Sequence, residues 1–405
     1  MTDKTAKIYF ERYAWPRRLF PEYTPSKYLN IGIVLPAFNE PEIEKAINAI
    51  TNCIPPQGQV VLLVIINESE SCDSSITLQN QKTIAALDGF DLLPSWLELK
   101  YTYLRLPQKK AGVGLARKIG MDEVAFWFNN LSKNGIIVCF DADSTCSENY
   151  LQEIELAFFQ QHHKACISYY EHPLNIASGV IEYELHLRYY IDALRFAGYP
   201  RAFQTLGSCI SVDSETYIQC GGMNTRKAGE DFYFLHQIAL FNDIHEINTV
   251  SIFPSDRLSE RVPFGTGKAL QEYRSVKKLL TYSIQTFLDI ESYLAQTQLL
   301  LAGEKLKLSP QMNQFLQEQN FDLAWIKMEK QAGKDIEKLE QLFFNWWNGF
   351  RMLKYIHFRR DAGDAMIDPT DAIHGLNKVY WNELLPTNPK ELLMWIRAKD
   401  RAYSK

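Results

Sequence analysis

The chain has 405 residues, of which 46% are hydrophobic and 13% aromatic, a composition that is typical of a globular protein and excludes a disordered one. The formal net charge of −5 gives no electrostatic reason to expect a nucleic-acid partner. No stretch reaches about 18 uninterrupted apolar residues, no secretory signal opens the chain, and the seven cysteines form no CxxC pair. We therefore expect a cytoplasmic protein with reduced cysteines and no transmembrane segment.

The first half of the chain alternates between strand and helix patterns. Residues 1–28 are polar and aromatic, and we expect them to form an extension that lies on the first domain. Short apolar runs then predict strands at residues 28–35, 60–66, 97–103 and 136–140. Asn39, Pro41 and Glu42 have the spacing of a helix cap, first turn and capping box, which predicts a helix directly after the first strand. Strands that alternate with helices indicate a mostly parallel sheet with right-handed crossovers.

Two further strands are predicted at 165–170 and 203–212. The pattern changes beyond about residue 267, where residues 268–301, 309–331 and 333–358 have long helical periodicities. We therefore predict three parts: the extension at 1–28, an α/β domain at 29–267 and an α-helical domain at 268–405. The aromatic face between Phe343 and Leu353 favours core packing, while an acceptor-binding face or a peripheral membrane contact stays open.

Two carboxylates follow the most apolar strand. The run from Ile136 to Phe140 leads directly into Asp141 and Asp143, with Ser144 behind them. Ligands of open α/β sheets bind at the carboxyl ends of strands, and two adjacent acids repel each other unless a cation lies between them. Hard oxygen ligands suit Mg²⁺ or Mn²⁺. The alternative is a simple Asp-Ala-Asp-Ser turn that closes the strand.

Several stretches, in this order, resemble the family 2 glycosyltransferases of GT-A fold. They are IVLPAFNE, GLARKIGMD, CFDADS, and QTLGSCISVDSETYIQCGGM followed by GED. The resemblance covers about residues 29–267. It implies a Rossmann-like, mostly parallel sheet flanked by helices. It also implies an inverting enzyme that transfers a sugar from a nucleotide-diphosphate sugar, UDP-sugar being favoured. The hydroxyl acceptor is left open as a saccharide, a lipid-linked molecule or a small molecule.

The resemblance also implies roles for individual residues. Asp143 and Asp141 would hold Mn²⁺ or Mg²⁺, with Asp141 beside the ribose or on a metal-bound water. Asp231 is the first choice for the general base and Glu230 the second, although an acidic first helical turn would look the same. Arg117 is expected near the nucleotide or near a partner acid. The residues implied to bind the substrate are Pro36, Ala37, Asn39, Glu40, Glu68, Arg117, Asp141, Gly207 and Gly222.

The chain departs from the family pattern at three places. Asn67 and Glu68 stand where many members carry two aspartates that meet the uracil ring, which leaves the identity of the base open. Lys118 replaces a common asparagine. The QxxRW motif and membrane helices of the processive members are missing, so a membrane-spanning polymerase is not expected.

A basic, glycine-bearing segment follows the predicted sheet. It carries Arg257, Arg261 and Lys268 around Gly265–Thr266–Gly267, and predicts either a lid that clamps a diphosphate or a linker between domains.

Three other functions remain open at this point. A retaining GT-A transferase would share the donor site and differ in the placement of the base. A catalytically degenerate GT-A domain could act as a binding scaffold, although the intact acid pairs argue against it. A sugar nucleotidyltransferase would need a glycine-rich signature after the first strand, and PAFNE is not one.

Overall fold

The computed structural model describes residues 3–174, 179–255 and 278–403. These residues group into two compact units, which are described separately. The first unit comprises 1–176, 205–268 and 399–405, and the second comprises 177–204 and 269–398, in each case without the residues outside the described ranges. The predicted boundary at 267/268 and the predicted basic segment from Arg257 to Lys268 lie outside the described residues. The sequence analysis did not separate residues 177–204 from the α/β domain.

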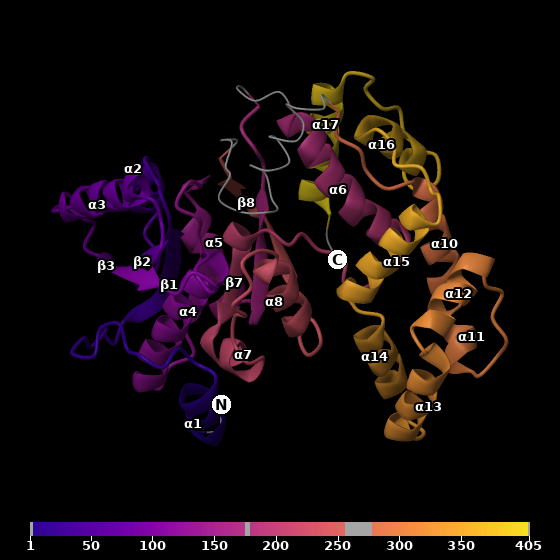
Figure 1. The fold of residues 1–405 in the computed structure, drawn as a ribbon, viewed down its shortest axis with the longest axis horizontal. Helices are drawn as coiled ribbons and strands as arrows, with labels where there is room; N and C mark the ends of the chain where they lie inside the picture. Colours follow the sequence, from indigo (N-terminus) through magenta and orange to yellow (C-terminus); the bar gives the residue numbers. More distant parts are fainter. Residues whose placement is uncertain (1–2, 175–178, 256–277, 404–405) are drawn as a thin grey trace. The chain divides into compact units, whose positions relative to one another are not determined.

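The first unit is built on an eight-stranded mixed sheet with the strand order β3-β2-β1-β4-β7-β6-β8-β5 (Figure 1). The strands are β1 (Leu29–Ala37), β2 (Gln59–Ser69), β3 (Leu97–Leu106), β4 (Ile136–Cys139), β5 (Thr145–Cys146), β6 (Ala165–Tyr170), β7 (Ile210–Asp213) and β8 (His245–Phe253). Of these described strands, β7 and β5 run antiparallel to their neighbours, and the others share one direction. The predicted α/β class with a mostly parallel sheet is confirmed.

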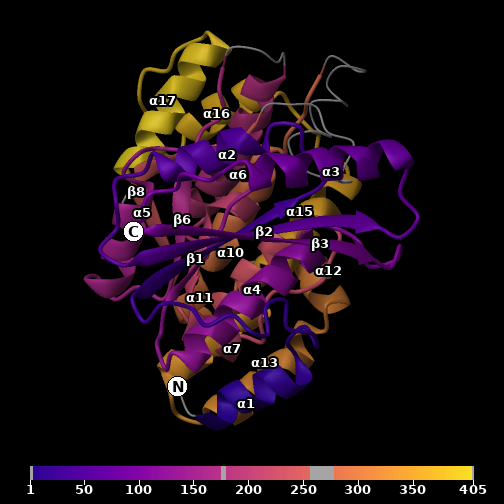
Figure 2. The same cartoon turned by 90° about the vertical axis from the view of Figure 1, so that its left-hand side faces the viewer.

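Helices cover both faces of this sheet. Figure 2 shows α2 and α3 on one face of β1–β3 and α4 on the other. The helices of the unit are α1 (Asp3–Arg12), α2 (Ile43–Thr51), α3 (Ser74–Asp88), α4 (Val113–Asn130), α5 (Tyr150–Phe159), α7 (Ser214–Gln219) and α8 (Glu230–Ile238). A Cβ atom at Gly32 would lie 2.3 Å from Cγ1 of Val124, and one at Gly120 would lie 2.4 Å from Cγ1 of Val34. Both glycines are therefore required for the close packing of α4 on β1.

The N-terminal extension lies on the first unit, as predicted, and contacts helix α4, although its own helix α1 was not foreseen. The hydroxyl of Tyr9 donates to Oδ1 of buried Asp122 at 2.5 Å. Arg18 donates to both carboxylate oxygens of Glu123, at 2.9 and 2.6 Å. Nζ of Lys118 lies 3.1 Å from Oδ2 of Asp122. Lys118 therefore serves to hold this buried cluster.

Two local predictions in the first unit are wrong. Asn39 does not cap α2: its φ of 49° is left-handed, the helix begins at Ile43, and the backbone N–H of Glu42 donates to the carboxylate of Glu40 at 2.9 Å. The predicted strand at 203–212 is shorter, because Gly207–Cys209 form a 3₁₀ turn (η1) before β7. In both places contacts with other elements override the local pattern.

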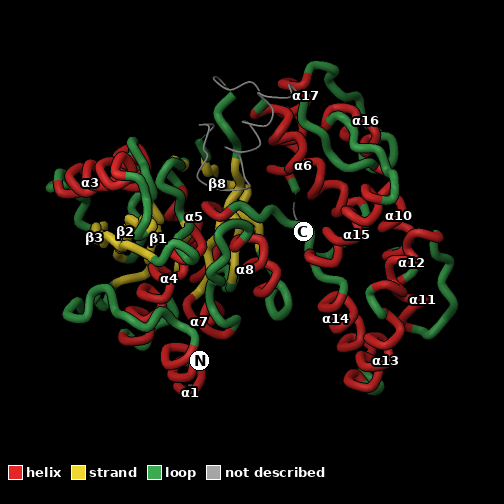
Figure 3. The backbone as a smooth tube through the Cα atoms, in the orientation of Figure 1, coloured by secondary structure: helices red, strands yellow, loops and turns green. Residues whose placement is uncertain are grey.

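The second unit is helical, apart from an isolated bridge between Thr281 and Ile367, in its described residues (Figure 3). Its helices are α6 (Val180–Phe196), α10 (Ile284–Leu294), α11 (Thr297–Leu301), α12 (Pro310–Glu318), α13 (Phe321–Ala332), α14 (Ile336–Trp346), α15 (Gly349–Asp361), α16 (Pro369–Asn377) and most of α17 (Pro389–Ala402). Each long helix predicted from periodicity is divided. The helix predicted at 333–358 breaks at Asn348, whose side chain caps α15 by accepting from the N–H of Arg351 at 3.1 Å.

The aromatic face of this region forms a core, as favoured. Phe343 and Trp347 are 1% and 0% exposed. Trp347 packs edge-on against Tyr293 and Phe315, with ring centroids 5.2 and 5.8 Å apart. Phe350, placed on the same face by the sequence, is 40% exposed because the chain turns before it. No helix in the described part of the chain is long and apolar enough to cross a membrane.

Candidate active site

A single buried guanidinium joins two of the predicted acidic segments. Arg117 lies on α4 and is 2% exposed. Its Nη2 donates to Oδ1 of Asp141 at 2.6 Å, and its Nη1 donates to Oε1 of Glu230. Asp141 follows the carboxyl end of β4, whereas Glu230 is the first residue of α8. The expectation that Arg117 meets a partner acid is confirmed, and it meets two.

Glycines allow the chain to close around this guanidinium. A Cβ atom at Gly207 would lie 2.6 Å from Nη1 of Arg117. One at Gly114 would lie 2.1 Å from the carbonyl oxygen of Arg226 and 3.1 Å from Cβ of Glu230. The turn η1 and the first turn of α4 can approach the cluster only without side chains at these positions. The structure therefore brings Gly207 together with Arg117, Asp141 and Glu230.

Asp231 stands next to this cluster at the start of α8. Its side chain is half-buried, and its Oδ1 accepts from the N–H of Phe232 at 2.7 Å. Burial and the neighbouring charge of Glu230 raise the pKa of Asp231 to about 7, although Arg117 acts in the opposite direction. A carboxyl group with this pKa can accept a proton near neutral pH, as a general base must.

Arg117 remains charged in this environment. Burial lowers its pKa, but the carboxylates of Asp141 and Glu230 raise the pKa by more, so the net shift is upward. A fixed positive charge at the end of the central strands can balance the acids and help to attract an anionic ligand.

The turn after β4 contains both predicted metal ligands. The N–H of Phe140 still donates to the carbonyl of Val34 at 3.0 Å, and the N–H of Ser144 donates to the carbonyl of Asp141 at 3.0 Å. The Asp-Ala-Asp-Ser turn, which was the alternative to a metal site, is therefore present. Asp141 and Asp143 are both half-buried on this turn. Among the described residues no group of three or more His, Cys, Asp and Glu could hold a metal ion. One or two carboxylates are nevertheless the usual protein share of an Mg²⁺ site whose other ligands are phosphate oxygens and water.

Glu68 at the end of β2 holds neighbouring elements together. It is fully buried, and its two carboxylate oxygens accept from Asn80 at 3.0 Å and from Thr77 at 3.2 Å. Nε of Arg105 lies 3.2 Å away. Burial raises the pKa of Glu68, but hydrogen bonds from Tyr103, Asn80 and Thr77 outweigh it and leave the pKa below the ordinary value. Glu68 therefore ties α3 to β3, and its contact with a nucleotide stays a prediction.

Helix α3 also holds the loop after β1. The predicted substrate-binding residues there are Pro36, Ala37, Asn39 and Glu40, of which the first two lie at the end of β1. The N–H of Asn39 donates to Oδ1 of Asn80 at 2.9 Å, and the carbonyl of buried Glu40 accepts from Thr83 at 2.9 Å. Sequence reasoning missed Asn80 and Thr83. The signal that could have found them is two polar residues at helical spacing on the buried side of α3.

Gly222 packs against the N-terminal helix, and its contact with a substrate stays a prediction. It follows α7 with a φ of +75°, and a Cβ atom there would lie 2.0 Å from the hydroxyl of Tyr9. Its described contacts join it to α1 and α7 rather than to the Arg117 cluster. The glycine is explained by the approach of the N-terminal helix.

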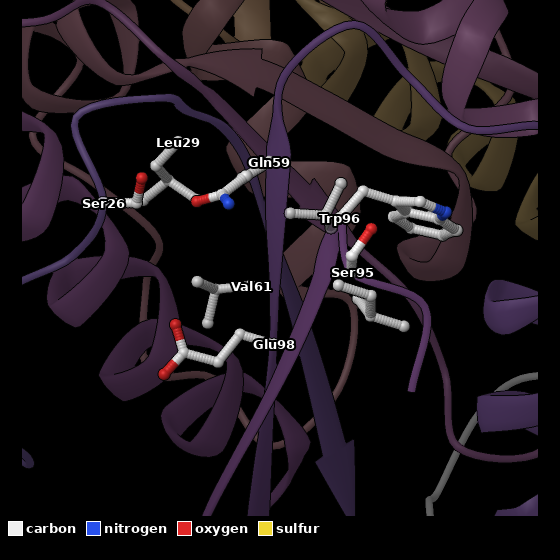
Figure 4. A pocket seen from close by; sticks show the side chains of 9 residues that line it. Ser26, Leu29, Gln59, Val61, Ser95, Trp96 and Glu98 are labelled. Atoms are coloured by element: carbon white, nitrogen blue, oxygen red, sulfur yellow. The ribbon is translucent and has the colours of Figure 1, made fainter. Parts of the chain in front are cut away.

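A cavity of about 230 Å³ lies at the amino ends of strands β1, β2 and β3 (Figure 4). It is lined by Ser26, Leu29, Gln59, Val60, Val61, Ser95, Trp96, Leu97 and Glu98. Leu29, Gln59 and Leu97 are the first residues of β1, β2 and β3. Ligands of such sheets bind at the carboxyl ends of the strands, so this cavity is not part of the Arg117 cluster.

Comparison with solved structures finds similar chains of Staphylococcus aureus TarS. TarS 1–349 in complex with UDP-GlcNAc is 13% identical with a TM-score of 0.39, over 82% of this chain and 91% of that chain. The same part of TarS in complex with UDP is 12% identical with a TM-score of 0.39, over 82% and 91%. A further TarS structure has a TM-score of 0.38 at 12% identity, over 82% of this chain and 55% of that one. Similarity at this level identifies no function. No family model and no curated protein sequence matches the chain.

Proposed function

We propose that the chain is a metal-dependent, inverting glycosyltransferase that uses a nucleotide-diphosphate sugar, with UDP-sugar favoured. One observation carries this proposal: the guanidinium of Arg117 joins Asp141, at the end of β4, to Glu230 beside Asp231 at the start of α8. The family 2 resemblance relates those same segments to donor binding and to the general base.

Arg117 has a positioning role in this proposal. Two buried or half-buried carboxylates near the same point would repel each other, and one cation between them removes most of that repulsion. Because Arg117 is planar and almost completely buried, it also fixes the distance between the turn after β4 and the start of α8. The donor side and the acceptor side of the site are thereby held in register.

Asp231 is the base in this proposal, and Glu230 is not. Glu230 is 3% exposed and its carboxylate is engaged by Arg117. Asp231 is less buried, and its pKa of about 7 suits proton transfer at neutral pH. The helix N-terminus favours an ionised acid, and burial offsets that effect here. Asp231 takes the proton of the acceptor hydroxyl while the oxygen bonds to the anomeric carbon. The bond from that carbon to the diphosphate breaks, and the configuration inverts.

Asp143 and Asp141 are the residues that would hold Mn²⁺ or Mg²⁺. When bound, the ion would supply positive charge to the diphosphate leaving group. Oδ1 of Asp141 accepts from Arg117 at 2.6 Å, so we expect the ion on the other oxygen of Asp141 and on the carboxylate of Asp143.

The test is release of nucleotide diphosphate from UDP-, GDP- and dTDP-sugars by the full chain, with Mn²⁺ and with EDTA. We expect one donor to be hydrolysed, faster with Mn²⁺, and NMR of the freshly released sugar to show the anomer opposite to that of the donor. Asp91→Asn is the matched control for Asp231→Asn, because Asp91 is exposed and distant in sequence from the residues of the proposed site. A product with the donor's configuration would favour the retaining alternative. Nucleotide binding without any turnover would favour the scaffold, and no binding of any donor would overturn the proposal.

A further inference from the structure

Two thiols from distant parts of the first unit lie side by side. Cys53 follows α2, and Cys146 is the second residue of the edge strand β5. Their Sγ atoms are 3.8 Å apart, although 93 residues separate them in the chain. The backbone N–H of Ile54 donates to the carbonyl of Glu148 at 2.7 Å, so the two segments are joined beside the thiols. Both sulfurs also lie near the carbonyl oxygen of Ala49, at 3.4 and 3.9 Å.

The other described thiol contacts are of a different kind. Cys72 contacts the hydroxyl of Thr77 at 3.4 Å, and the sulfur of Cys139 contacts that of Met121 at 3.6 Å. Cys209 contacts the hydroxyl of Ser208 at 3.9 Å, and the thiol of Cys220 donates to the carbonyl oxygen of Tyr217 at 3.2 Å. None of these contacts offers a second thiol. The pair of Cys53 and Cys146 (the thiol pair) therefore differs from these thiols in having a reaction partner in place.

We propose that the thiol pair is a modification site that reacts with low-molecular-weight disulfides and forms an intramolecular disulfide. One thiol of the pair, as the thiolate, attacks one sulfur of the small disulfide, which releases one small thiol and leaves a mixed disulfide. The other thiol then loses its proton and attacks the protein sulfur of the mixed disulfide, which releases the second small thiol. Two protein thiols are oxidised, and one small disulfide is reduced to two thiols.

The geometry requires little movement. A disulfide has a sulfur–sulfur distance of about 2.0 Å, so the two Sγ atoms at 3.8 Å must approach by about 1.8 Å. Rotation about the Cα–Cβ bonds can supply part of this approach. The hydrogen bond from Cys146 lowers the pKa of Cys53, against the effect of burial. Cys146 is the more exposed of the two, while Cys53 is 4% exposed.

The disulfide would close a long loop that contains β2, α3, β3, α4 and β4. Closing a loop of this length constrains the unfolded chain, so the melting temperature should rise by about 5 °C or more, if the native geometry is kept. The proposal does not depend on nucleotide-sugar transfer, and its readouts involve no nucleotide. Its failure and the failure of the proposed function can therefore be told apart.

The experiment is oxidation of the folded full chain by oxidised glutathione, followed by acid quenching, thiol counting after denaturation, and peptide mass mapping. The chain has seven cysteines, and we expect the count to fall by two, with Cys53 and Cys146 in one linked peptide. The protein should lose two hydrogens in mass, and reduction should restore both thiols and the original melting temperature.

Three variants make the test specific. Cys53→Ser and Cys146→Ser should abolish the loss of two thiols, whereas the matched control Cys72→Ser should keep it, since Cys72 is partly exposed but has no thiol partner. Circular dichroism of each reduced variant establishes that it is folded. A wild-type chain that retains all seven thiols would overturn the proposal, and so would a linked peptide that lacks Cys53 or Cys146.

Discussion

Replacing Asp231 with asparagine should change how the stability of the protein depends on pH. The pKa of this carboxyl rises from its ordinary value of 3.8 to about 7 in the folded chain. At about 1.36 kcal/mol per pKa unit, the rise corresponds to about 4 kcal/mol of unfolding free energy as an upper limit. Asp231 is half-buried, and solvent screening reduces the expected effect to about 1–4 kcal/mol.

The sign follows from which state binds the proton more tightly. The folded chain has the higher pKa, so this contribution to stability is fully present below pH 4 and is lost as the pH rises through about 7. Asparagine cannot ionise, so the variant should not lose this contribution. We expect Asp231→Asn to gain stability relative to the wild type as the pH rises from 5, where only part of the contribution has been lost, to 8, where all of it has been lost.

Denaturant unfolding at pH 5 and pH 8 measures this difference, with the exposed Asp91→Asn as control. If the difference between Asp231→Asn and the wild type is the same at both pH values, Asp231 does not titrate as argued. The same variant should bind nucleotide and metal within a few-fold of wild type while turnover falls by about 10²–10⁴. If Glu230→Gln abolishes turnover while Asp231→Asn stays active, the roles of the two acids are exchanged.

Three further variants test the rest of the site. Arg117→Met should lower the unfolding free energy by about 3–5 kcal/mol, because it leaves buried acids without their counter-charge, and near-wild-type denaturation would contradict the bridging role. Gly207→Ala should cost about 1–3 kcal/mol through its clash with the guanidinium, whereas in Gly89→Ala, a matched control, the new Cβ would lie 3.4 Å from its nearest neighbour. Asp143→Ala should lose most metal-dependent UDP binding in calorimetry; wild-type donor binding that EDTA leaves unchanged would remove the metal from the proposal.

Local patterns determined the architecture of the first unit. The apolar runs at 28–35 and 60–66 predicted strands buried on both faces, since a sheet covered by helices on both sides needs apolar residues at successive positions. The observed strands are Leu29–Ala37 and Gln59–Ser69. The sequence also placed Asp141 and Asp143 directly after a central strand. The acid pair at the start of α8 was predicted as well, and so was the helical nature of the described residues beyond 267. All of these depend on residues that are close together in the chain.

The tertiary structure alone decided how these parts meet. Arg117 and Glu230 are 113 residues apart, and their ion pair depends on the packing of α4 against the sheet rather than on any local pattern. The same reason explains the turn at Gly207, the contact of Gly222 with Tyr9, and the break before α15. A steric clash or a buried charge pair between distant segments outweighs the local preference of a few residues for strand or helix. Such contacts exist only once the whole unit is assembled, so the periodicity of the sequence could not reveal them.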